Sequence, residues 1–297
     1  MPFRRLSPSV ALPWILRASW LVLPFAAGPA LAAALDPRSA AVRTTASAGL
    51  WLGWALVVVA LLVPHPLSLT VVRVVAPAGL AGVGLAALGG LAEPVPLVLA
   101  VVATALAAAL ALLPETGTWL INGGAYGDER RHLLRPPRAL LAGPIPLAWA
   151  VLVSAVAGGP LLLAAQRWVV GGLALAGGLP VTLVTARALH SLTLRWAVLV
   201  PAGLVLKDHL AVVDPVLLRR VDIEVLRPAP PGTDALDLTA GAPGLALEAR
   251  LREAVPLMRV VPGRRPGEPG RSAALRFTPT RPGTVLAEAR SRRIRVG

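Results

Sequence analysis

The most distinctive polar residues lie between two apolar parts of the chain, in the segment 114–138. The segment combines the chain's one tyrosine, two adjacent acids and a run of arginines: Tyr126, Asp128, Glu129, Arg130, Arg131, Arg135 and Arg138. Basic residues beside a membrane attract anionic lipid headgroups, each contributing about 1 kcal/mol. We hypothesise that this segment binds such headgroups or docks on the C-terminal part of the chain. The alternative is a basic loop that sets topology and whose acids pair locally.

A metal or catalytic role for these residues has little support. Glu129 and His132 are three residues apart, a spacing that can ligate a metal on a helix, but no second such pair exists among the four histidines. The chain lacks cysteine, which excludes disulfides and thiolate sites. Hydrolase and phosphate-binding motifs are missing as well. We therefore expect no metal, no cofactor and no enzymatic activity.

A second basic cluster lies near the C-terminus, at Arg290, Arg292, Arg293 and Arg295. It is a candidate contact with lipid headgroups, and the alternative is a solvated helix end. The C-terminal arginines are interleaved with acids, and Trp196 and Phe277 are the only aromatic residues there, so no stacking platform for bases is apparent. We expect the partners to be lipid or protein, and not nucleic acid.

The composition is that of a polytopic membrane protein. Of the 297 residues, 56% are hydrophobic and only 15% are charged, whereas a soluble domain has about 25% charged residues. Six apolar segments are near the length that crosses a bilayer. They are Ala18–Leu35, Ala48–Val63, Val74–Ala92, Pro94–Leu113, Ala139–Ala157 and Trp168–Ala186. The fifth can shift, because residues 158–165 are also apolar.

The distribution of arginines predicts the orientation. Arg4 and Arg5, the arginines of segment 114–138, and Arg187 all fall on one side of a six-span chain. The positive-inside rule then places both termini in the cytoplasm, in the inner (plasma) membrane. The first segment can instead be read as a signal peptide with a small-residue cleavage site near Ala30–Ala32. Cleavage would leave five spans and the same side for the C-terminus.

The pattern changes after residue 190, which divides the chain into a membrane part, 1–190, and a water-soluble part, 191–297. Short β-like runs separated by Pro- and Gly-containing turns fill most of the second part. The expected strands are Leu192–Val200, Leu204–Asp208, Leu210–Val213, Val221–Leu226, Ala235–Leu238, Leu245–Leu251, Leu257–Val261 and Ala273–Phe277. A helix should follow, with Thr280 as N-cap and Pro282 in its first turn. The predicted fold is thus a bundle of about six membrane helices followed by a small β-rich domain with a C-terminal helix.

This order of elements carries a resemblance. A hairpin with Arg195-Trp196, Pro201-Ala202-Gly203 and Asp208, further strands and a helix entered through Arg281-Pro282 resembles bacterial pleckstrin-homology-like domains of membrane proteins. The whole chain resembles a family of multi-pass membrane proteins of high-GC bacteria in which Tyr-Gly-Asp-Glu-Arg-Arg precedes Arg-Pro-Pro, here at 126–131 and 135–137. The resemblance implies a location and an architecture, and it brings no activity.

Two functions stay open on this basis. The first is a non-catalytic scaffold or regulator whose cytoplasmic domain binds a protein or the inner leaflet. The alternative is a transporter or permease component with a regulatory C-terminal domain. The centres of the predicted spans contain no Asp, Glu, Lys or His, which argues against a proton or sodium carrier.

Overall fold

The structure, a computed structural model, describes residues 8–261 and 263–297 and divides into two compact units. The membrane unit takes in the chain up to Gly123 together with Leu147–His190. The β unit takes in Gly124–Pro146 together with Ser191–Gly297. The segment between the fourth and fifth spans thus belongs to the same unit as the C-terminal part, and the chain passes between the units three times.

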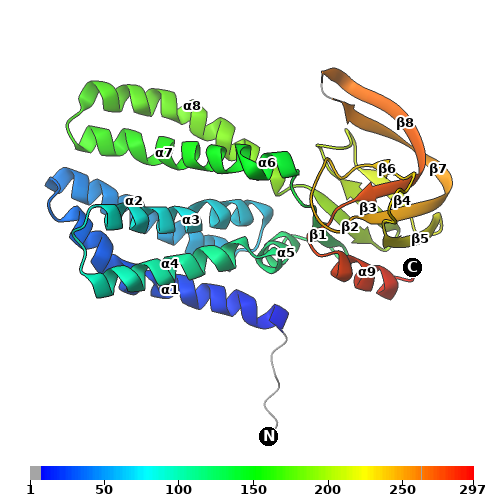
Figure 1. Cartoon of the computed structure of the whole chain (residues 1–297), viewed down its shortest axis with the longest axis horizontal. Coiled ribbons are helices and arrows are strands. Elements are labelled where there is room, and N and C mark those ends of the chain that lie inside the picture. The colour runs from blue at the N-terminus through cyan, green and yellow to red at the C-terminus, as the bar shows by residue number, and fades with distance from the viewer. Residues whose placement is uncertain (1–7, 262) are drawn as a thin grey trace, which may run out of the picture. The chain divides into compact units, whose positions relative to one another are not determined.

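Six helices of the described chain are long and apolar enough to cross a membrane (Figure 1). They are α1 (Pro8–Leu35), α2 (Ala40–Leu62), α3 (Pro66–Leu88), α4 (Pro94–Leu112), α7 (Pro144–Ala164) and α8 (Trp168–Leu192). Two short helices, α5 (Pro114–Asn122) and α6 (Arg138–Ala142), lie between α4 and α7. The chain is therefore a multi-pass membrane protein, as the sequence predicts.

Prolines mark where several of these helices begin. Pro66, Pro94 and Pro114 occupy the first turns of α3, α4 and α5, where the missing N–H is not needed for a helical hydrogen bond. The fifth span begins at Pro144 rather than at Ala139, because Gly143 interrupts the helix that the apolar run suggests. It extends instead through the apolar residues that follow Ala157.

Small residues let the membrane helices pack closely. Ala27 and Ala30 of α1 are buried against Val83 of α3 and Ala100 of α4. This packing makes α1 part of the bundle interior. In the α7–α8 hairpin, a Cβ at Gly171 would lie 2.8 Å from the backbone nitrogen of Leu163, so the two helices touch through glycine.

The β unit contains two four-stranded sheets and a closing helix. The strands are β1 (Arg130–Leu133), β2 (Trp196–Val200), β3 (Gly203–Lys207), β4 (Val216–Arg219), β5 (Ile223–Pro228), β6 (Leu236–Asp237), β7 (Leu247–Val261) and β8 (Arg264–Phe277). One sheet has the order β1-β2-β3-β4, and the other has the order β5-β7-β8-β6. All pairs are antiparallel except β6 with β8. Helix α9 (Pro282–Ser291) follows the last strand.

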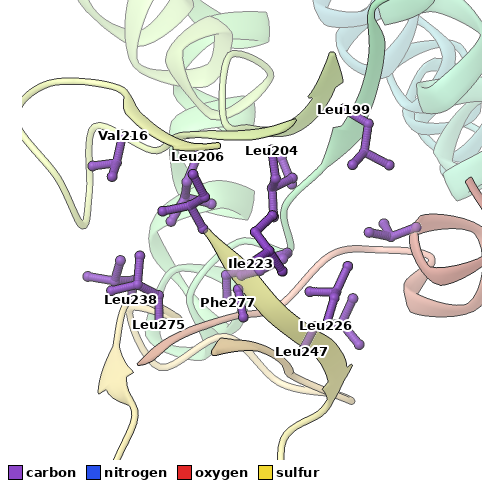
Figure 2. Close-up of a cluster of buried hydrophobic side chains, with 14 of the residues drawn as sticks. Leu199, Leu204, Leu206, Val216, Ile223, Leu226, Leu238, Leu247, Leu275 and Phe277 are labelled. Carbon is purple, nitrogen blue, oxygen red and sulfur yellow. The ribbon is translucent and has the colours of Figure 1, made fainter. Parts of the chain in front are cut away.

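Aliphatic side chains from both sheets meet in one core (Figure 2). Leu204 and Leu206 of the first sheet and Leu247 and Phe277 of the second are fully buried there. Helix α9 closes the core with residues that share one face, Val285 and Ala289, and with Ile294 beyond its end. Fully burying one such side chain stabilises the fold by about 1.5–3 kcal/mol.

Some sequence predictions for this unit were wrong in detail. Residues 210–213 form a turn rather than a strand, although Val213 donates a backbone hydrogen bond to Met258. The expected strands Leu257–Val261 and Ala273–Phe277 are parts of longer strands, because β7 and β8 continue as one long hairpin in which β8 already begins at Arg264. The N-cap of α9 is Arg281 and not Thr280, whose N–H instead bonds the carbonyl of Leu133.

Candidate functional site

The segment 124–138 is built into the β unit. Strand β1 pairs with β2, with Arg131 opposite Val198 and Leu133 opposite Trp196. Beyond the strand, Leu134 donates a backbone hydrogen bond of 3.0 Å to the carbonyl of Arg195. The structure thus brings this segment and the C-terminal part together, as hypothesised, but through main-chain pairing rather than through the carboxylates of Asp128 and Glu129.

A buried ion pair holds this junction. The Nε and Nη2 atoms of Arg195 donate to the two carboxylate oxygens of Asp208, at 2.6 and 2.7 Å. The third donor, Nη1, bonds the carbonyl of Arg135 at 3.0 Å. The two charged side chains are 1% and 0% exposed. Arg195 therefore links the segment between spans four and five to the start of β2 and the end of β3.

Trp196 lies between two cations. The guanidinium of Arg131 is 4.7 Å from the ring centroid, and the ammonium of Lys207 is 5.0 Å from it. Such contacts stabilise by about 0.5–1 kcal/mol when exposed and more when desolvated. Arg131 also pairs with Glu129, so this predicted contact residue is satisfied inside the segment itself.

The remaining acid and the tyrosine of the segment are exposed. Tyr126 is 89% exposed, and Asp128 is exposed with its backbone carbonyl accepting a hydrogen bond from Arg292. Arg292 also pairs with Glu288 one turn earlier in α9. This contact brings the end of α9 beside Asp128, so the two basic groups singled out in the sequence adjoin each other in the structure.

Several arginines of these two basic groups remain exposed. Arg290, Arg293 and Arg295 are exposed, and their side chains form no ion pair or hydrogen bond within the part of the chain that the structure describes. Arg130 is exposed too and bonds only the carbonyl of Glu129. We call Arg130, Arg290, Arg293 and Arg295 the basic surface. Arg131 and Arg292 do not belong to it, because their side chains pair with Glu129 and Glu288. Arg135 does not belong to it either, because it is only partly exposed and its Nε is buried, without a hydrogen-bond partner in the described residues.

His132 is buried between β1 and α9. Its Nε2 atom has no hydrogen-bond partner among residues 8–261 and 263–297. Burial lowers the pKa of His132 to about 4, against an opposing effect of Glu288 and a further lowering by Arg281 and Arg292. The imidazole is therefore neutral at physiological pH. Because Arg130–Leu133 is a strand, the helical ligand spacing of Glu129 and His132 does not arise, and no group of three metal-binding side chains occurs in the described residues.

Sequence reasoning missed a second buried carboxylate, Glu248. Its oxygens accept hydrogen bonds from Thr233 at 2.6 Å and from Arg227 and Arg250 at 3.1 Å. Burial raises the pKa of Glu248, and these hydrogen bonds outweigh it, so the pKa lies below its usual value. The sequence signal was weak, since a Glu inside an alternating strand is ordinarily solvent-facing.

Comparison of the chain with protein-family models, with curated proteins and with solved structures gives no match. The site is therefore interpreted from its own geometry. That geometry is a network of arginine contacts that assembles the β unit, beside a group of exposed arginines.

Proposed function

We propose that this protein is a non-catalytic scaffold or regulator of the bacterial inner membrane whose β unit lies in the cytoplasm and binds anionic lipid headgroups. The single observation that carries the proposal is the basic surface. Its arginines are exposed, and the side chains of Arg290, Arg293 and Arg295 form no ion pair within the described residues. Each such residue near an anionic leaflet contributes about 1 kcal/mol of attraction.

The architecture of the β unit supports a binding rather than a catalytic role. Two sheets closed by a C-terminal helix agree with a pleckstrin-homology-like domain of the high-GC bacterial family that the sequence resembles. A protein ligand is the other occupant that this surface could accept. We favour lipid, because the unit is tied to spanning helices by three short connections and so works beside a charged leaflet.

The assembly of the unit supports regulation. Residues on both sides of the α7–α8 hairpin form one sheet, since β1 precedes the hairpin and β2 follows it. A ligand that binds the β unit can therefore influence the ends of α5, α7 and α8 together.

The test uses the full chain, which contains no cysteine. A Ser291→Cys variant carries an environment-sensitive fluorophore beside the basic surface and is reconstituted in vesicles of phosphatidylcholine with or without phosphatidylglycerol. We expect phosphatidylglycerol to shift the emission to the blue, and high salt to reverse the shift. Adding Arg290→Ala, Arg293→Ala and Arg295→Ala should weaken the binding of the β unit to the anionic leaflet about 100-fold, because each arginine contributes about 1 kcal/mol.

The matched control removes three exposed arginines elsewhere in the unit, as Arg219→Ala, Arg220→Ala and Arg252→Ala. This control should keep the response to phosphatidylglycerol. Equal emission with and without the anionic lipid would overturn the lipid assignment. An equal loss of the emission response in both triple variants would show that only the net charge of the β unit matters, and not the basic surface.

A further inference from the structure

Arg73 is a cation inside a membrane-spanning helix. It lies seven residues after the start of α3 at Pro66, which is about 10 Å along the helix axis. Its Nε atom is buried, and the side chain has no hydrogen bond or ion pair within residues 8–261 and 263–297. The residue as a whole is half-buried.

Arg17 shows how the same chain satisfies an intramembrane arginine. Its Nε and Nη2 atoms donate to the carbonyl of Leu61 at 3.2 and 2.9 Å, at the C-terminal end of α2. Its guanidinium also lies 4.8 Å from the ring of Trp14 and 5.1 Å from that of Trp119. Arg73 has none of these contacts, although an unpaired charge at this depth is costly.

No carboxylate of the chain is placed to neutralise Arg73. The six spanning helices contain no Asp or Glu, and the residues before Pro8 contain none in the sequence either. No ion pair joins Arg73 to an acid elsewhere in the described chain. An anion from outside the chain could therefore supply the counter-charge.

The neighbours of Arg73 form a seam between the α1–α4 bundle and the α7–α8 hairpin. Thr70, three residues earlier, is hydrogen-bonded to Nδ1 of His190 in α8 at 2.8 Å. Val74, the next residue, accepts a hydrogen bond of 2.9 Å from Nε1 of Trp149 in α7. Arg73 thus lies on α3 beside two side-chain hydrogen bonds that join this helix to the hairpin.

We propose that Arg73 is the anchor of a phosphate-binding site at this seam. Side chains on a helix lean toward its N-terminus, so the guanidinium reaches toward the end of α3 that begins at Pro66. This end of α3 lies near the boundary of the hydrocarbon core, next to the headgroup region that contains the phosphates of the leaflet. An arginine matches a phosphate through paired N–H donors. The source of the phosphate is a phospholipid headgroup or free phosphate.

The experiment uses the delipidated full chain in a mild uncharged detergent and measures Tm against added ligand. Three probes separate the sources: phosphatidylglycerol, inorganic phosphate, and diacylglycerol, which has acyl chains without phosphate. We expect phosphatidylglycerol to raise Tm and diacylglycerol to leave it unchanged, since a ligand that binds only the folded state stabilises it. An equal rise with inorganic phosphate would assign the site to the free anion.

Variants connect the response to Arg73. Arg73→Gln should abolish the rise in Tm, Arg73→Lys should weaken it, and Arg187→Gln, which removes an exposed arginine of α8, should keep it. The Gln variant should fold at least as well as the parent without lipid, because it removes an unpaired charge. A Tm response in Arg73→Gln equal to that of the parent, or no response of the parent to either phosphate probe, would overturn the proposal.

Discussion

Arg195 and Asp208 form a two-pronged ion pair that is closed to solvent, at 2.6 and 2.7 Å, and the free prong of the arginine bonds the carbonyl of Arg135. One guanidinium therefore joins three parts of the β unit: the segment before α6, the start of β2 and the end of β3. Because Arg195 bonds the chain on both sides of the α7–α8 hairpin, it holds the two parts of the β unit together.

Removing one partner of this pair should unfold the β unit readily. Asp208→Ala leaves a buried, uncompensated guanidinium, which costs about 3–5 kcal/mol. A cysteine introduced at the buried position Ala249 reports the loss by pulse thiol labelling in urea, and labelling should begin at a lower urea concentration. Asp222→Ala is the control, because it breaks the exposed pair with Arg219, and it should change stability by at most about 1 kcal/mol.

Acid should weaken the β unit through His132. The unfolded chain takes up a proton as pH falls through about 6.5, whereas the folded chain does so only near 4. The free energy of unfolding therefore decreases between these values and levels off below about 4, with a total loss of about 3 kcal/mol.

The measurement for His132 is the urea midpoint between pH 7 and 4, with the same buried cysteine and a thiol reagent that works in acid. His132→Leu should remove this part of the pH dependence. Carboxylates that titrate in the same pH range affect the parent and the variant alike, so the difference between their two curves of urea midpoint against pH reports on His132. Parallel curves would contradict the assignment.

In the α7–α8 hairpin, replacing a glycine should lower stability only where that glycine contacts the neighbouring helix. Gly171→Ala places a methyl group 2.8 Å from the backbone of Leu163, so the helices must separate, at about 1–3 kcal/mol. Gly172→Ala gains the same helix propensity and meets nothing within 4 Å. We expect Gly171→Ala to lower Tm in detergent by a few degrees relative to Gly172→Ala. Equal Tm values would show that the hairpin is not closely packed.

Orientation can be tested with the same cysteine-free background. Ser39 precedes α2, and Ser291 ends α9. With both termini in the cytoplasm, Ser39→Cys should react with an impermeant maleimide in intact cells, while Ser291→Cys should react only after permeabilisation. The reverse pattern would invert the proposed topology. Labelling of both in intact cells would place the two positions on one side of the membrane and contradict the five spans, α2, α3, α4, α7 and α8, that lie between them.

The parts of the fold that the sequence predicted were those with local signals. Apolar runs of span length became α1–α4, α7 and α8, and Pro282 does begin α9. Strand β1 had no such signal, because Arg-Arg-His-Leu does not alternate and becomes a strand only through its pairing with β2. The long β7–β8 hairpin likewise runs through prolines and glycines that ordinarily mark turns, and register with a neighbouring strand overrides them.

The site was predictable in composition but not in arrangement. Tyr126 and the exposed arginines stand out by their rarity or clustering, so sequence alone could single them out. The predicted hairpin already placed Arg195 opposite Asp208, but the burial of this pair and its bond to the carbonyl of Arg135 depend on the pairing of β1 with β2, which had no local signal. Arg73 directly precedes the predicted third span, Val74–Ala92, whereas α3 begins at Pro66 and so includes it, and its lack of a partner is a property of packing alone.

The position of β1 has a consequence for biosynthesis. Strand β1 leaves the ribosome before α7 and α8, and its partner β2 leaves after them. The first sheet can therefore close only when the hairpin has entered the bilayer and returned the chain to the same side. A chain whose last two helices fail to insert would keep β1 unpaired, with Leu133 and Leu134 exposed to quality-control proteases. The β unit can therefore complete its fold only after the last two helices have inserted.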